Sequence, residues 1–283
     1  MTVFVLRVIL PFGMKMKRCL AIFVCGMMAA MTLTSCRSSR RLESAEDSPL
    51  GGLAGALVVV ECASGRETIY RADVASTRFP PCSTFKIVNA LVGLETGIVA
   101  LSGAPFYQWD HVERSIPAWN RDLSLREAFQ ASCVPAFQEL ARQIGRARMQ
   151  GWIDKLGYGN QDLSAGIDGF WLPAKGRNTI LISPKEQVRL MQRVVAGDVP
   201  FSKHSLAVLK ELMFIKETAQ GTLYGKTGSG TDEHGTFVLG WFVGYVESKG
   251  RTYAFACVAQ GRQIMSKDAR AITEGYLQDQ GWL

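Results

Sequence analysis

The spacing of hydrophobic residues changes twice along this chain. Both ends carry apolar runs or alternating stretches of strand length, with turns at Gly65 and at Ser248–Gly250; they cover residues 56–62, 67–71, 236–247 and 251–260. From residue 98 to about 215 the apolar positions follow mostly helical spacing. This arrangement predicts an α+β fold: an antiparallel sheet of five to seven strands, built from both chain ends and flanked by helices, with an all-helical insertion.

Start signals support several of the helices. Ser124-Leu125-Arg126-Glu127 and Ser183-Pro184-Lys185-Glu186 each place a glutamate three positions after a capping serine, which is the pattern of a capping box. Proline at the first helical position strengthens the second signal. Ser266 is predicted to cap a last helix, with Ile272, Tyr276 and Leu277 pointing inward.

A further helix is predicted to begin at Ser83, where a loop rich in proline and serine gives way to an apolar run. Its apolar face consists of Ile87, Val88, Ala90, Leu91 and Leu94, and Gly97 ends it. Three residues make close to one helical turn, so Ser83 and Lys86 project from the same face. The sequence therefore predicts an amine within reach of a hydroxyl.

The pair Ser83 and Lys86 is a candidate nucleophile and base. A serine hydroxyl is a poor nucleophile until a base removes its proton, and a lysine can be that base only if its own charge is suppressed. The alternative is an N-cap serine followed by an ordinary surface lysine, because S-x-x-K alone occurs by chance in many chains. The case for catalysis therefore depends on partners elsewhere in the sequence.

Composition and charge exclude several classes of function. Of 283 residues, 47% are hydrophobic and 20% charged, which suits one globular unit with an ample core. The net charge of +7 overstates the basicity: the first 36 residues hold four basic side chains and no acid, and without them 28 basic side chains face 25 acidic ones. No basic run with interleaved aromatics occurs, so nucleic-acid binding is unsupported. His111, His204 and His234 are scattered and no C-x-x-C pair occurs, so no metal site is predicted.

Residues 1–36 have the pattern of an export signal. The charged segment Lys15–Arg18 precedes an apolar stretch, residues 20–34, that is short for a membrane span. Leu33-Thr34-Ser35-Cys36 resembles the bacterial lipobox, whose cysteine becomes the lipidated first residue of the mature protein; ordinary signal cleavage is the alternative. We expect an exported, periplasmic protein whose only membrane contact is a lipid anchor at Cys36 in the outer membrane.

The rest of the chain is predicted to be a tether and one domain. Residues 37–52 are polar and would form a flexible tether, and residues 53–283 would form the folded domain. Met14 and Met16 are alternative start positions, which leaves the true start of the chain open.

Three short motifs follow Ser83 in chain order. They are Ser132-Cys133-Val134 at a break between helices, Tyr158-Gly159-Asn160 in a turn, and Lys226-Thr227-Gly228 on a strand. Taken singly, they are typical of a capping serine, a tight turn and a solvated edge strand. A lysine, a threonine and a serine along an edge strand also make a good platform for a carboxylate, and glycine lets a ligand approach the backbone.

Together the motifs resemble those of the penicillin-recognising serine enzymes. S-x-V at Ser132–Val134, Y-G-N at Tyr158–Asn160 and Phe170-Trp171-Leu172 are similar to the class D, or oxacillinase-type, β-lactamases. Flanking phrases are similar too: Ala141–Gly145, Gly240–Gly244 and Lys267–Arg270. The resemblance runs from about residue 55 to the C-terminus and implies the β-lactamase/transpeptidase-like fold.

The resemblance implies hydrolysis of the β-lactam ring of penicillin-type antibiotics through an acyl-enzyme on Ser83, and with it antibiotic resistance. No glutamate lies between Asn160 and Pro184 to activate the deacylating water. Class D enzymes use a carbamylated lysine instead, so Lys86 would be N6-carboxylysine and the general base for acylation and deacylation. Carbon dioxide or bicarbonate would supply the carboxylate, and no other cofactor is implied.

Two apolar residues are assigned to the surroundings of Lys86 by the same resemblance. An apolar pocket disfavours the ammonium and leaves a reactive neutral amine. Trp171 would donate its indole N–H to the carbamate. Val134 would shield the modified lysine.

The remaining roles concern proton transfer and substrate binding. Ser132, near Lys226, would relay a proton to the leaving nitrogen. The backbone N–H groups of Ser83 and Ser229 would form the oxyanion hole. The implied substrate-binding residues are Thr227, Gly228, Ser229 and Arg270.

Related functions share parts of this pattern. Membrane penicillin sensors carry a similar domain that stays acylated, together with several transmembrane helices and a zinc-protease segment, neither of which this sequence shows. A cell-wall transpeptidase or carboxypeptidase would be expected to have S-x-N rather than Ser132–Val134, and a generic esterase would need a G-x-S-x-G elbow with a histidine. The substrate spectrum stays open, as does the choice between monomer and homodimer.

Four cysteines would lie in the mature chain: Cys62, Cys82, Cys133 and Cys257. In an oxidising periplasm three disulfide pairings are open to them, and four buried, reduced thiols are the alternative that we favour. Cys82 precedes Ser83 and stands where the family usually has alanine, so a disulfide there would change the shape of the cleft.

Overall fold

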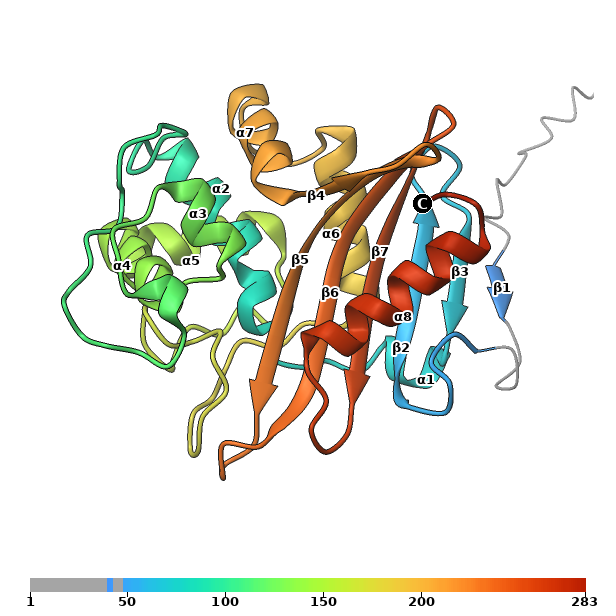
Figure 1. Cartoon of the computed structure of the whole chain (residues 1–283), viewed down its shortest axis with the longest axis horizontal. Coiled ribbons are helices and arrows are strands. Elements are labelled where there is room, and N and C mark those ends of the chain that lie inside the picture. Colours follow the sequence, from blue (N-terminus) through green and yellow to red (C-terminus); the bar gives the residue numbers. More distant parts are fainter. Residues whose placement is uncertain (1–39, 43–47) are drawn as a thin grey trace, which may run out of the picture. The chain divides into compact units, whose positions relative to one another are not determined.

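The computed structural model describes residues 40–42 and 48–283, which form a seven-stranded sheet packed against helices (Figure 1). The strand order is β1-β3-β2-β7-β6-β5-β4. β2 (Ala54–Glu61) and β7 (Arg251–Gln260) pair antiparallel along their length, so strands from the two chain ends meet in the middle of the sheet. This confirms the predicted fold class.

The central strands are long and buried on both faces. β5 (Gly221–Thr231), β6 (Phe237–Ser248) and β7 are antiparallel neighbours, and β6 and β7 are buried along most of their length. Cover on both faces explains why their sequences are apolar runs rather than alternating patterns. The other strands are short: β3 (Glu67–Tyr70), β4 (Phe214–Glu217) and β1 (Arg40–Leu42), which runs parallel to β3.

The two faces of the sheet are covered by different parts of the chain. α8 (Ser266–Asp279, red in Figure 1) packs on one face, against β5, β6 and β7. α6 (Pro184–Ala196) packs on the opposite face, in the larger core that also contains the helical insertion. Because side chains alternate along a strand, Lys226 and Thr227 of β5 point to opposite faces.

The helical insertion is confirmed, but it is less helical than the prediction of a mostly helical stretch from 98 to about 215. That stretch contains α3 (Leu125–Gln130), α4 (Val134–Ile144), α5 (Arg146–Leu156), α6 and α7 (Lys203–Met213), and α2 (Lys86–Glu95) precedes it. Both predicted capping boxes are present, at Ser124 and Ser183. Residues 98–124 and 157–183 contain no α-helix, because glycine, proline, aspartate and asparagine favour turns there.

Two details of the elements differ from the sequence prediction. Ser266 is the first residue of α8 rather than its cap; the cap is Met265, whose N–H donates to Asp268 Oδ2 at 2.7 Å. Asp268 thus supplies the capping carboxylate from the third helical position, as the glutamate of a capping box does. The short elements β4 and α1 (Ala72–Ala75) were not predicted, because four residues carry too little periodicity.

The predicted export signal, with Cys36, lies outside the described residues. Within the stretch predicted as a tether, Arg40–Leu42 pair with β3, and Leu50 is buried against the α8 side of the sheet. The boundaries at residues 36 and 52 stay predictions. Among the residues that the structure describes, no helix has the length and apolar character needed to cross a membrane.

Candidate active site

Ser83 lies in a single 3₁₀ turn, η1 (Cys82–Phe85), that leads directly into α2 at Lys86. In a 3₁₀ turn, side chains three positions apart are eclipsed, and Lys86 Nζ donates a hydrogen bond to Ser83 Oγ at 2.9 Å. Cys82 has a φ of 51°, a left-handed conformation that costs a non-glycine residue about 1–3 kcal/mol. The predicted contact of amine and hydroxyl is therefore present, on a strained turn.

Lys86 is fully buried in apolar surroundings. Its Nζ lies 5.4 Å from the ring centroid of Phe137, and Ser83 is its hydrogen-bond partner within the described residues. Burial lowers the pKa of Lys86 to about 7, and the nearby thiols of Cys133 and Cys82 offset this effect only in part. Near neutral pH a large fraction of this side chain is therefore the nucleophilic free amine.

Trp171 forms a wall of the same aromatic cluster. Its ring stacks on Phe85 at 5.5 Å with an interplanar angle of 22°, and it meets Phe170 edge to face. The indole Nε1 is buried and has no hydrogen-bond partner among the residues that the structure describes. An unmade hydrogen bond at a buried donor costs about 1–3 kcal/mol, so such a donor calls for an acceptor that is absent from the bare chain.

Ser132 and Lys226 form a second pair of hydroxyl and amine. Ser132 lies in the break between α3 and α4 with a φ of 53°, and its N–H donates to Phe129 O at 3.1 Å. Lys226 Nζ donates to Ser132 Oγ and to Thr227 O, both at 3.0 Å. Lys226 is buried; this burial and then the charge of Lys86 lower its pKa well below the usual range. The two amines thus lie close enough for their charges to interact.

The Lys226–Gly230 part of β5 passes directly beside Ser83. β4 pairs only with residues Thr222–Tyr224, so in residues 40–42 and 48–283 no strand pairs with the outer side of this part of β5. A Cβ on Gly228 would lie 3.0 Å from Pro81 O and 3.1 Å from Ser83 N. Glycine therefore favours the close approach of the strand to Ser83, since any side chain here would crowd the backbone of η1.

Thr227 and Arg270 line a pocket of about 360 Å³ together with Lys226. The strand register places Thr227 opposite Phe242, and the Arg270 guanidinium lies 5.8 Å from the Phe242 ring centroid. Residues directly opposite in a sheet project to the same face, so Arg270 of α8 lies at the side of Thr227. Arg270 and Thr227 thus line the same pocket from the same face of the sheet, which is compatible with the predicted carboxylate site.

The other predicted residues have mixed surroundings. The Ser229 hydroxyl accepts a hydrogen bond from Ser266 N–H at 3.0 Å, so it links β5 to the start of α8. Val134 is the half-buried first residue of α4. The roles predicted for these two residues stay predictions.

The four cysteines of the described residues are free thiols. Cys82 and Cys133, beside the two serines, are fully buried, and burial raises the pKa of Cys82 to about 12. Since the thiolate is the reactive form, the Cys82 thiol is inert at neutral pH. Of the four, Cys62 is half-buried rather than buried.

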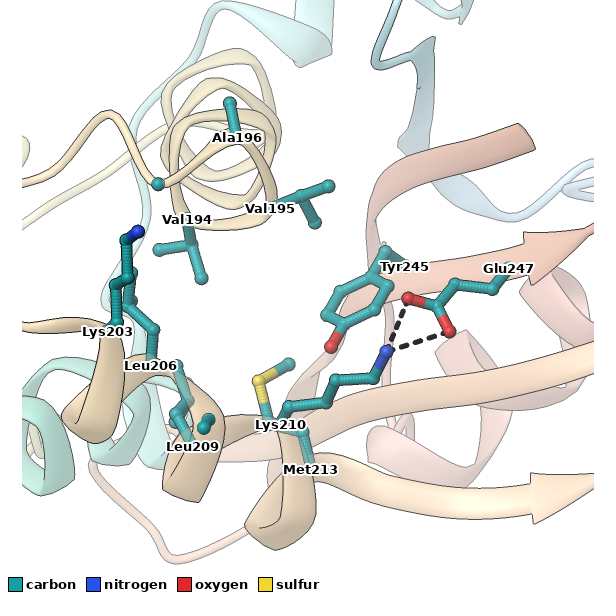
Figure 2. A pocket seen from close by; sticks show the side chains of 12 residues that line it. Val194, Val195, Ala196, Lys203, Leu206, Leu209, Lys210, Met213, Tyr245 and Glu247 are labelled. Atoms are coloured by element: carbon teal, nitrogen blue, oxygen red, sulfur yellow. Dashed lines mark hydrogen bonds and ion pairs between the residues drawn. The ribbon is translucent and has the colours of Figure 1, made fainter. Parts of the chain in front are cut away.

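A second pocket, of about 320 Å³, lies between α6, α7 and β6 (Figure 2). The Tyr245 hydroxyl points into it, and Lys210 Nζ binds both carboxylate oxygens of Glu247 at 2.7 and 2.9 Å. Its apolar lining includes Val194, Leu206, Leu209 and Met213. None of the predicted site residues lies in this pocket, so the candidate chemistry belongs to the Ser83 side of the molecule.

Comparison with known proteins agrees with this geometry. Residues 55–277 match the sequence profile of the penicillin binding protein transpeptidase domain. The β-lactamase OXA-19 of Pseudomonas aeruginosa is 35% identical over 237 residues, which cover 81% of this chain and 87% of that protein. The crystal structure of a class D β-lactamase from Bacillus subtilis superposes with a TM-score of 0.76 at 34% identity, covering 83% of this chain and 94% of that one. The chain belongs to the class D β-lactamases.

This class D β-lactamase is therefore a β-lactam hydrolase. The C-terminal domain of the Bacillus licheniformis BlaR penicillin-receptor is also similar, with a TM-score of 0.79 at 28% identity over 86% of this chain and 97% of that domain. Both kinds of relative share the fold that brings Ser83, Lys86, Ser132 and Lys226 together in this β-lactamase.

Two residues linked to Arg270 by ion pairs were not predicted from the sequence. Glu274 accepts hydrogen bonds from Arg270 Nε at 2.5 Å and from Lys216 Nζ at 2.7 Å. The spacing of Arg270 and Glu274, four residues apart on a predicted helix, was a usable signal. Nothing local pointed to Lys216, which lies 58 residues away from Glu274 in the sequence.

Proposed function

We propose that this enzyme opens the β-lactam ring of penicillin-type antibiotics through an acyl-enzyme on Ser83, with Lys86 carrying a carboxylate. The observation that carries the proposal is Lys86 itself: a fully buried amine with a pKa of about 7, hydrogen-bonded to Ser83 Oγ at 2.9 Å. Burial of this kind is costly for a charged lysine and suits a neutral amine that reacts with carbon dioxide.

The unpartnered indole of Trp171 supports the carboxylate on Lys86. A carbamate brings an anion into the aromatic cluster, and an anion in a buried place needs hydrogen-bond donors. Within the described part of the chain, Trp171 Nε1 is a buried donor without a partner, on a ring stacked against the residue that precedes Lys86. When present, the carboxylate supplies the general base for acylation and deacylation.

The other residues of the site supply binding and proton transfer. Ser83 attacks the lactam carbonyl, and the backbone N–H groups of Ser83 and Ser229 stabilise the oxyanion; losing one such donor typically lowers the rate about 10²–10³-fold. Ser132, held by Lys226 at 3.0 Å, relays the proton to the leaving nitrogen. Hydrolysis of penicillins by an exported form of this enzyme would protect the cell from these antibiotics.

The test is steady-state turnover of a chromogenic cephalosporin with and without added bicarbonate. We expect sustained turnover that rises with bicarbonate, and none in Ser83→Ala. Turnover by Ser83→Ala would remove Ser83 as the nucleophile. Turnover indifferent to bicarbonate, after thorough removal of dissolved carbon dioxide, would overturn the role of a carboxylate on Lys86.

A penicillin sensor is the second candidate function, favoured by the likeness to the BlaR receptor domain. A sensor domain would be acylated at Ser83 without releasing the product. A single stoichiometric burst of the chromogenic substrate, followed by a stable adduct in intact-protein mass spectra, would support this candidate against the hydrolase.

A further inference from the structure

Arg270 belongs to a chain of two ion pairs that reaches from β4 to the wall of the pocket that Lys226 and Thr227 line. Glu274 lies at the centre: its Oε1 accepts from Arg270 Nε at 2.5 Å, and its Oε2 accepts from Lys216 Nζ at 2.7 Å. The Glu274 side chain is only 18% exposed, so the two bonds are less screened than those of a typical surface ion pair. Partial burial raises the pKa of Glu274, but the bonds from Lys216 and Arg270 outweigh this and hold it below its usual range.

The geometry leaves the carboxylate-binding edge of Arg270 free. The Glu274 bond uses Nε, and within the described residues Nη1 and Nη2 make no hydrogen bond. The guanidinium also lies over the ring of Phe242, 5.8 Å from its centroid. Two contacts therefore fix the group while its terminal amino groups, which bind carboxylates in a bidentate manner, stay available beside Thr227.

A bulge in β4 puts Lys216 where it meets Glu274. Phe214 pairs with Tyr224, but the next pair is Lys216 with Leu223, so Ile215 is an extra residue in the strand. Leu223 belongs to the cluster on the α8 face of the sheet, and a residue directly opposite it projects to that same face. Without the extra residue, Ile215 would take this position and Lys216 would point away from α8.

The order of the pair on α8 gives little reason to see it as a helix stabiliser. Acid before base at i, i+4 is the favourable order, and here Arg270 precedes Glu274. The charges also matter as a set, because Lys216, Glu274 and Arg270 sum to one positive charge. An isolated pair of Arg270 and Glu274 would be neutral and would attract an anion weakly, so Lys216 restores the positive charge while it anchors Glu274.

We propose that Glu274 and Lys216 are positioning residues that orient Arg270 and thereby make this site specific for β-lactams bearing a carboxylate. The inference rests on the proposed function, since it assumes that Arg270 receives the substrate carboxylate. Substrate binds to an arginine already fixed in direction, so less side-chain freedom is lost on binding.

The test compares a penicillin with its neutral methyl ester in the full-length protein. Acylation of Ser83 is followed by intact-protein mass, and steady-state kinetics give KM and kcat. The variants are Glu274→Ala, Glu274→Gln and Lys216→Met, with Arg270→Ala as the reference. Lys210→Met, which removes the Lys210–Glu247 ion pair of the other pocket, is the matched control.

We expect Glu274→Ala to raise KM for the acid about fivefold to tenfold, with kcat changed less than about twofold and the ester unaffected. Glu274→Gln keeps an acceptor for Arg270 Nε, so its KM for the acid should lie between that of Glu274→Ala and that of the native protein. Lys216→Met should raise KM for the acid about twofold to fivefold. Lys210→Met should leave KM unchanged for both the acid and the ester.

Glu274→Ala separates positioning from charge, because it makes the site more positive. A pure charge effect would lower KM for the anionic substrate, whereas lost positioning raises it. An unchanged or lower KM, or an equal loss with acid and ester, would overturn the proposal. If the alanine variant fails to fold, the KM values of Glu274→Gln for acid and ester are used instead. A higher KM for the acid alone would indicate lost positioning, and a lower one would indicate a pure charge effect.

The outcome also distinguishes this inference from the proposed function. Suppose that Arg270→Ala has the same KM values for acid and ester as the native protein. Arg270 would then not be the carboxylate site and the inference would fall, while hydrolysis through Ser83 would stand. A native protein that is acylated without turnover would overturn the hydrolase, yet the acylation rates of acid and ester would still decide the role of Glu274.

Discussion

At the scale of single residues, the chemistry of this enzyme depends on where two groups are buried. Lys86 is an amine without a carboxylate partner among the described residues, and Trp171 is an indole N–H without an acceptor. Each is unfavourable alone, and together they support the proposed carboxylate on the amine. Ser83 and Lys86 needed only local spacing to be predicted, whereas the burial that lowers the pKa of Lys86 comes from packing against distant residues such as Phe137.

The pKa of Lys86 predicts how the enzyme responds to carbon dioxide. Carbamate formation releases a proton from the free amine, and below pH about 7 the ammonium must first lose another. The dissolved carbon dioxide needed for half-maximal activity should therefore fall as pH rises, and more steeply below pH about 7 than above it. Turnover at controlled carbon dioxide between about pH 5.5 and pH 8.5 measures this, and a constant slope across that range would contradict a lysine of this pKa.

Trp171→Phe should weaken the hold on the modified lysine while it keeps most of the packing. Loss of one charge-assisted hydrogen bond, worth about 1.5–3 kcal/mol, should raise the bicarbonate needed for half-maximal activity at least tenfold. Trp152→Phe is the control, since Trp152 stacks on Phe201 away from the site. Equal bicarbonate dependence in the two variants would show that the Trp171 indole N–H is not the donor.

At the scale of elements, one strand and one turn define the site. η1 carries Ser83, and β5 carries Lys226, Thr227 and Gly228 past it on its unpaired side. The sequence predicted the strand, and it predicted an α-helix from Ser83 where the structure has the 3₁₀ turn η1 before α2. Their contact was beyond prediction, since it depends on β4 ending its pairing at Thr222–Tyr224, and four-residue strands leave no periodicity to read.

Gly228→Ala tests this contact. A Cβ there would lie 3.0 Å from Pro81 O and 3.1 Å from Ser83 N, and both are backbone atoms that cannot rotate away. The strand should move off η1 and misplace the oxyanion-hole donor, so acylation should slow at least about tenfold with a smaller effect on unfolding. Gly151→Ala, on α5 with open space around it, should leave acylation unchanged; a native rate in Gly228→Ala would refute the argument.

At the scale of the whole molecule, the sheet joins the two chain ends and the helical insertion covers one of its faces. β2 and β7 pair along their length, so strands from both chain ends share one sheet. In this sheet β5 lies beside η1, although more than a hundred residues separate η1 from β5 in the sequence. The sequence predicted this arrangement from strands at both ends. The prediction of a mostly helical insertion failed at 98–124 and 157–183, where apolar side chains anchor irregular loops.

The anchoring of the whole protein is a further prediction at this scale. If Cys36 is lipidated, Cys36→Ala should move the protein from the membrane fraction to the soluble periplasmic fraction, with catalytic activity unchanged. Cell fractionation with labelled palmitate measures this directly. Unchanged fractionation, or no label in the native protein, would favour ordinary signal cleavage.

The sequence alone determined the family and the fold class and singled out the residues to which we assign the chemistry, because capping boxes, S-x-x-K and K-T-G act over three or four positions and leave local patterns. Tertiary structure decided what those residues experience. The burial of Lys86, the unpartnered indole of Trp171 and the 3.0 Å bond between Lys226 and Ser132, 94 residues apart, all arise between distant segments. So does the link from Lys216 to Glu274, which a single extra residue in β4 directs. Such contacts depend on register and packing between elements, and no spacing within one element encodes them.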